Sequence, residues 1–119
     1  MRYLLTIYTD ESSWATMTPE DGAAMTAAYG AFGREARDAG VLLGGEGLQP
    51  TATATTVRVR DGETLFTDGP FAETREHLGG YMIIDVANLD EALAFAAKGP
   101  LAAAGSIEVR PMRDGTPTA

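Results

Sequence analysis

Residues 2–9, Arg2-Tyr3-Leu4-Leu5-Thr6-Ile7-Tyr8-Thr9, are the stretch that decides the fold. In an extended strand, successive side chains point to opposite faces. Tyr3, Leu5 and Ile7 then share one face, and Leu4, Thr6 and Tyr8 share the other. Both faces are apolar enough to need cover, so we predict a strand with protein packed on each side.

The rest of the chain alternates between helix and strand signals. Thr18-Pro19-Glu20-Asp21 offers a hydroxyl cap, an early proline and two acids, which predicts a helix that runs to Gly40. Asn88, followed three residues later by Glu91, predicts a second helix that Gly99-Pro100 ends. Further strands are predicted over residues 41–48, 55–60, 63–66, 78–86 and 106–112. Asp61-Gly62 is a hairpin turn signal, and we expect a loop over Asp68-Gly69-Pro70-Phe71.

This order of elements predicts a single α+β domain over residues 1–113, with residues 114–119 as a flexible C-terminal tail. A ferredoxin-like antiparallel sheet with two helices on one face fits the pattern. The helix-free face then needs another cover, and we expect Leu4, Tyr8, Met82 and Ile84 to lie on it. Monomers rarely expose an apolar face of this size, so we predict a homodimer packed sheet against sheet.

Composition excludes several classes of function. The chain has 17 acidic and 9 basic residues, a net charge of −8, which disfavours binding to nucleic acid. It has no cysteine, so a disulfide framework, a thiolate metal site and a cysteine nucleophile are excluded. The apolar run at the N-terminus is too short for a signal peptide or a membrane span. We therefore expect a cytoplasmic protein without membrane partners.

The longest motif is Asp68-Gly69-Pro70-Phe71-Ala72-Glu73-Thr74-Arg75-Glu76, followed by Leu78-Gly79-Gly80-Tyr81. It resembles the DGPF subgroup of the YCII-related family. The resemblance extends to Gly44-Gly45-Glu46-Gly47-Leu48 and to Asp90-Glu91-Ala92, and so covers nearly the whole chain.

The resemblance implies a ferredoxin-like domain that forms a dimeric α+β barrel, similar in architecture to muconolactone isomerases and small monooxygenases. It implies no settled activity, although a related YCII-type enzyme eliminates chloride from a chlorinated hydroxyhydroquinone. Genes for DGPF proteins often lie beside alternative sigma factors. The wider family's proposed dyad uses a histidine on the first helix, and the first helix predicted here contains none. The dyad therefore cannot be carried over.

Carboxylates are the main candidates for catalysis. Asp68, Glu73 and Glu76 lie close in sequence, and neighbouring acids can raise one another's pKa as acid–base chemistry requires. Alternatively, they are solvated turn residues, with Asp68 accepting backbone N–H groups in an Asx turn. His77 is the only histidine and is a candidate proton shuttle beside Glu73 or Glu76, or else an exposed side chain.

Glu46 lies among three glycines, whose missing side chains leave room for a ligand beside a carboxylate. Alternatively, the glycines mark a bulge and Glu46 pairs with Arg58 or Arg110. The candidate substrate-binding residues are Tyr29, Arg58, Phe71 and Tyr81. Neither metal-ligand spacing nor a phosphate-binding glycine loop is present, so we expect no metal and no organic cofactor.

Two functions follow from these residues. The first is a cofactor-free lyase or isomerase that acts on a small organic compound between sheet and helices, with Glu46 or the Asp68–Glu73–Glu76 group moving protons. The second is a non-catalytic dimer that binds a small ligand or a protein partner and is linked to sigma-factor regulation.

Overall fold

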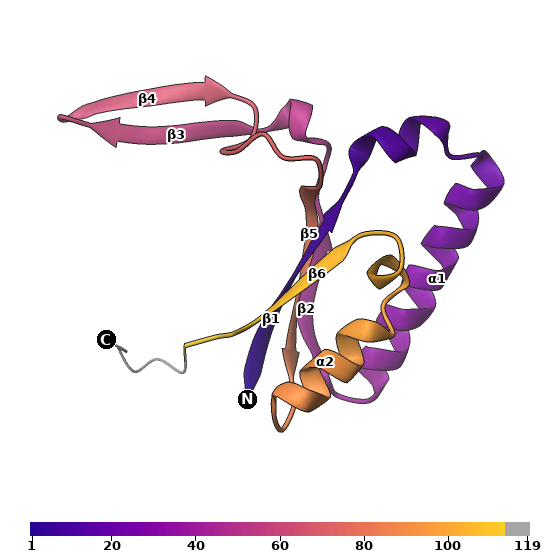
Figure 1. Cartoon of the computed structure of the whole chain (residues 1–119). Coiled ribbons are helices and arrows are strands. Elements are labelled where there is room, and N and C mark those ends of the chain that lie inside the picture. The colour runs from indigo at the N-terminus through magenta and orange to yellow at the C-terminus, as the bar shows by residue number, and fades with distance from the viewer. Residues whose placement is uncertain (114–119) are drawn as a thin grey trace.

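The computed structural model describes residues 1–113, so the tail predicted over residues 114–119 lies outside the described part. A four-stranded sheet runs through the centre in the order β2-β5-β1-β6, and each neighbouring pair is antiparallel (Figure 1). Its strands are β1 (Arg2–Thr9), β2 (Leu42–Gly47), β5 (His77–Asp85) and β6 (Ser106–Pro111). This confirms the predicted ferredoxin-like α+β fold.

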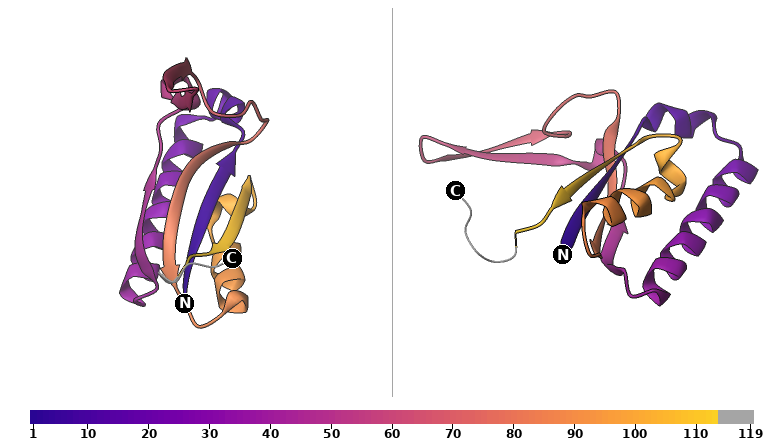
Figure 2. Two further views of the ribbon diagram at one scale, coloured as in Figure 1. Left: turned by 90° about the vertical axis from the view of Figure 1, so that its left-hand side faces the viewer. Right: turned by 60° about the horizontal axis from the view of Figure 1, so that its bottom comes forward.

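Both α-helices, α1 (Pro19–Asp38) and α2 (Leu89–Ala97), cover the same face of the sheet (Figure 2). They begin where the capping signals predict. Thr18 Oγ1 accepts the Asp21 N–H at 3.1 Å, and Asn88 Oδ1 accepts the Glu91 N–H at 3.0 Å. Three short 3₁₀ helices occupy connections: η1 (Glu11–Thr16), η2 (Thr51–Thr53) and η3 (Pro100–Ala102). Within residues 1–113, no helix is long and apolar enough to cross a membrane.

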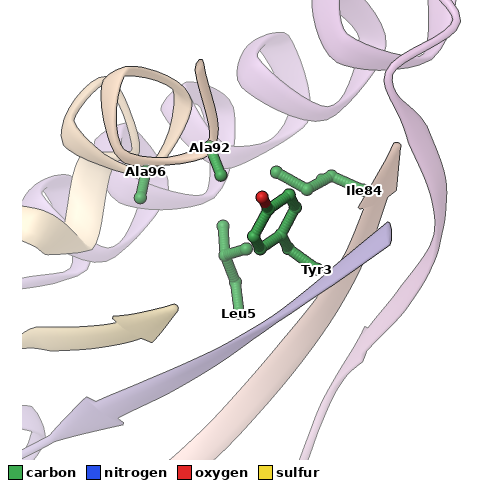
Figure 3. Packing of buried hydrophobic residues seen from close by; sticks show 5 residues of the cluster. All are labelled: Tyr3, Leu5, Ile84, Ala92 and Ala96. Carbon is green, nitrogen blue, oxygen red and sulfur yellow. The ribbon is translucent and has the colours of Figure 1, made fainter. Parts of the chain in front are cut away.

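The core lies between the sheet and α2. Tyr3 and Leu5 of β1 and Ile84 of β5 point toward Ala92 and Ala96 of α2 (Figure 3). The two alanines are small, which lets the helix approach the sheet and bury the larger side chains from the strands.

The register of β1 against β5 corrects one prediction. Tyr3 lies opposite Ile84, and Leu4 lies opposite Ile83. Residues directly opposite each other share a face of the sheet, so Ile83, not Ile84, shares the helix-free face with Leu4. The placement of Met82 and Ile84 on that face is therefore wrong. The sequence shows which residues of one strand share a face. The pairing with the neighbouring strand decides which of the two groups of side chains faces the helices.

The β3–β4 hairpin forms a separate two-stranded arm, β3 (Thr55–Arg60) and β4 (Glu63–Asp68), which leaves the sheet on the side away from the helices (Figure 1). Its turn is the predicted one, with positive φ of 52° at Asp61 and 78° at Gly62. β4 continues to Asp68, which lies opposite Thr55, so the loop begins one residue later than predicted. The Gly69 N–H still donates to the Ala54 carbonyl at 2.8 Å, which extends the ladder.

Candidate functional site

A cavity of about 360 Å³ lies between α1 and the sheet, where the sequence analysis placed a ligand site. Its apolar walls come from Ile7 of β1, Leu42 of β2, Met82 of β5 and Leu101 of η3. The volume falls at the lower end of the range for small-molecule sites, which are usually apolar with a few polar groups.

Glycines create this space. By register, Gly47 and Gly80 lie opposite each other, and Gly80 also lies opposite the buried Ile7, so both belong to the helix-covered face. Gly33 of α1 also lines the cavity, and a Cβ built on Gly33 or Gly47 meets no atom within 4 Å. The floor and one point of the roof therefore lack side chains, so an open volume remains between the helix and the sheet.

The polar groups of the roof come from one stripe of α1. Tyr29, Gly33 and Arg37 are spaced four residues apart and so lie along one side of the helix, and all three line the cavity. Burial raises the pKa of the Tyr29 phenol to about 12, so it remains a neutral hydrogen-bond donor at physiological pH. Arg37 is exposed and adds a positive charge at the mouth. Sequence reasoning missed Arg37, although its spacing from Tyr29 was a usable signal.

Glu46 is the only acid that lines this cavity in the described part of the chain. It also lines a smaller cavity of about 240 Å³ together with Arg37, at the outer strand β2. It is exposed, and it lies opposite Tyr81 in the register. Neither arginine considered as its partner pairs with it, since Arg110 bonds to Glu108 and the Arg58 guanidinium lies 5.9 Å from the Phe71 ring centroid.

Tyr81 occupies a different face from the one predicted for a ligand contact. It lies opposite Thr6, which alternates with the buried Leu5 and Ile7, so its side chain leaves the sheet on the helix-free side. Glu46 shares this face because it lies opposite Tyr81. Since both residues nevertheless line the cavity, their contributions there come from the main chains of β5 and β2. Arg58 of β3 lies over the Phe71 ring, and neither residue lines the cavity.

The predicted acidic group is spread over different elements. Asp68 ends β4, Glu73 is exposed in the connection to β5, and Glu76 accepts a hydrogen bond from Ser106 Oγ at 2.7 Å. Among residues 1–113, no three His, Asp or Glu side chains lie close enough to hold one metal ion. A catalytic role for these acids stays a prediction.

His77 begins β5 opposite Thr9, and its Nδ1 is buried with no hydrogen-bond partner among residues 1–113. Glu11 of η1, which the sequence analysis did not single out, lies close enough for its charge to interact with His77. Thr51 donates both its N–H and its Oγ1–H to the Glu11 carboxylate, at 2.9 and 2.7 Å. This contact joins η1 to the chain segment that leads into the arm.

The Glu11–Thr51 contact predicts a loss of stability in acid. Hydrogen bonds from Thr51 hold the pKa of Glu11 below its ordinary value of 4.5. The unfolded chain therefore binds a proton more readily, so this stabilisation is complete above about pH 4.5 and is lost as the pH falls through the folded-state pKa. We expect Glu11→Gln and Thr51→Val each to reduce the fall of the urea midpoint between pH 5 and pH 3. An unchanged slope in Glu11→Gln would contradict the assignment.

Comparison with known proteins identifies the domain. The sequence model of the YCII-related domain matches residues 1–115. The chain belongs to the YCII-related family. An uncharacterised protein of Rhizobium meliloti (strain 1021), R00369, is 42% identical over 114 residues, which cover 94% of this chain and 92% of that protein. The cavity and the arm therefore both lie within the YCII-related domain, and the predicted membership of the YCII-related family is confirmed.

Proposed function

We propose that this YCII-related protein binds a small, mainly apolar organic anion in the cavity under α1 and moves a proton on it without a cofactor. The observation that carries the proposal is the Tyr29–Gly33–Arg37 stripe above the glycine floor. The cavity therefore combines open space and apolar walls with the Arg37 cation at the mouth and the neutral Tyr29 hydroxyl, two turns or about 12 Å away along the helix. The motif Asp68–Phe71 further supports assignment to the DGPF subgroup.

The proposed chemistry is proton transfer next to a carbonyl group. A water molecule removes a proton from the carbon beside the carbonyl, and the negative charge moves to the carbonyl oxygen, where the Arg37 guanidinium stabilises it. Return of the proton to a different carbon completes an isomerisation. Expulsion of a leaving group from the adjacent carbon, with the proton passing to solvent, completes an elimination.

Phenylpyruvate is a suitable probe of binding, because it joins a carboxylate and an enolisable ketone to an apolar ring. We expect Arg37→Ala to weaken its binding at least tenfold, since a charge-assisted hydrogen bond to the ligand is lost. Isothermal titration calorimetry measures the effect. Arg34→Ala is the matched control, because Arg34 lies one turn away on α1 and does not line the cavity. Equal binding by the two variants would contradict the proposed site.

The same probe separates turnover from binding. The protein should accelerate exchange of the phenylpyruvate methylene protons in D₂O, followed by ¹H NMR. At saturating probe, Arg37→Ala should reduce that acceleration about 100-fold, because the cation that stabilises the enolate is lost, whereas Glu46→Gln should leave it unchanged. Binding without accelerated exchange in the unmodified protein would favour the non-catalytic ligand-binding module instead.

We also propose a homodimer formed through the helix-free face of the sheet. Leu4 and Ile83 lie opposite each other at the centre of this face, and Tyr8 lies opposite Leu78 on the same side. Apolar rows of this kind favour burial against another surface. A second copy offers the same face, as a two-fold axis requires.

A further inference from the structure

Within residues 1–113, the β3–β4 arm has one face in contact with the chain and one face with no cover. Thr56 and Arg58 are half-buried, with Arg58 placed over the Phe71 ring. On the opposite face, Val57 lies opposite Phe66, and Val59 follows two residues later. These three side chains are 57%, 71% and 59% exposed.

An uncovered two-stranded hairpin of this kind is marginally stable in water, because it buries little apolar surface. The shape of the chain shows the same deficit of contacts. The radius of gyration is 16.5 Å, whereas a compact domain of this length has about 13 Å. The arm therefore needs a surface that residues 1–113 of its own chain do not supply.

We propose that the arm crosses the homodimer interface and packs its Val57–Val59–Phe66 face on the second copy. The inference rests on the dimer proposed above. The arm and the helix-free sheet face lie on the same side of the molecule, so a partner seated on the sheet stands beside the arm (Figure 1). A two-fold axis then gives each copy the other's arm.

The length of the arm fits this arrangement. Six residues per strand span about 20 Å, and two sheets packed face to face are about 10 Å apart. The base of the arm therefore crosses the interface, and the outer half, with the Asp61–Gly62 turn, extends past the partner's sheet.

The sheet alone gives a small interface. Four strands cover a width of about 19 Å, and with strands of about 20 Å the footprint is about 400 Å². A stable interface usually buries about 800 Å² on each partner. Two exchanged arms enlarge the contact without extending the sheet.

The base of the arm is fixed before any partner binds. Thr51, just before β3, is held by the Glu11 carboxylate, and Thr56 Oγ1 donates to the Gly69 carbonyl at 2.9 Å. Less conformational freedom is therefore lost on association, which favours a tight dimer.

Phe66→Gln and Leu65→Gln test the proposal as a matched pair, because these neighbours lie on opposite faces of the arm. We expect Phe66→Gln to raise the dimer dissociation constant at least tenfold in sedimentation equilibrium, and Leu65→Gln to change it less than threefold. Equal effects of the two substitutions would overturn the proposal.

A direct contact measurement completes the test. In a dimer mixed from isotope-labelled and unlabelled copies of the unmodified protein, filtered NOEs should connect the Phe66 ring of one copy to methyl groups of the other. A dimer without such NOEs overturns the arm exchange and leaves the sheet interface standing. A monomer at all concentrations overturns both, while the phenylpyruvate experiments judge the cavity separately.

Discussion

Ile84→Lys should leave the chain unfolded at neutral pH, whereas Ile83→Lys should give a folded monomer. Ile84 is 0% exposed and packs with Tyr3 and Leu5 beneath α2. An ammonium group placed there has no partner, and burying it costs several kcal/mol. That cost is comparable to the whole stability of a small domain, about 5–15 kcal/mol.

Ile83 is the adjacent residue, but its side chain lies on the helix-free face opposite Leu4. A lysine there reaches water in the monomer and is buried only in the proposed dimer. Far-UV circular dichroism measures folding, and sedimentation velocity measures assembly. Identical behaviour of the two variants would contradict the assignment of faces, and a fully dimeric Ile83→Lys protein would exclude this face as the interface.

Local signals in the sequence predicted the elements well. The caps at Thr18 and Asn88 and the turn at Asp61-Gly62 each depend on atoms within four residues, so the sequence states them directly. The pairing of Ile84 with Tyr3 spans most of the chain, and no local pattern distinguishes it from a register shifted by one. The error over Ile84 has this origin.

The candidate site was predictable in part for the same reason. Glycines around Glu46 indicated open space, and the structure places a cavity there. The role of Arg37 follows from its spacing of eight residues from Tyr29, a signal in the sequence that identifies it only once Tyr29 is known to face the sheet. Glu11 meets Thr51 across 40 residues of chain, and both lie in connections without periodicity. Tyr81 was assigned to the wrong side because the assignment required the register of β5.

Gly45→Ala is expected to destabilise the protein by about 3 kcal/mol, the largest effect among the glycines of the cavity. Gly45 has a φ of 156°, and an added Cβ would lie 2.5 Å from the Tyr81 carbonyl oxygen and 3.0 Å from Met82 Cα. Both are main-chain atoms of the central strand β5, so neither can rotate away. Relief requires β2 to move outward, which breaks its ladder and opens the cavity floor.

Gly47→Ala is the matched control, two residues along the same strand. Its Cβ meets no atom within 4 Å, and the smaller entropy of the unfolded alanine chain should make the change neutral or stabilising by about 0.5 kcal/mol. Urea unfolding followed by circular dichroism and by the fluorescence of Trp14, the single tryptophan, measures both variants. Equal stability of the two would mean that β2 does not lie against β5 as described. Since that contact forms the floor under Arg37 and Tyr29, the same result would also remove the geometric basis for a ligand site beneath α1.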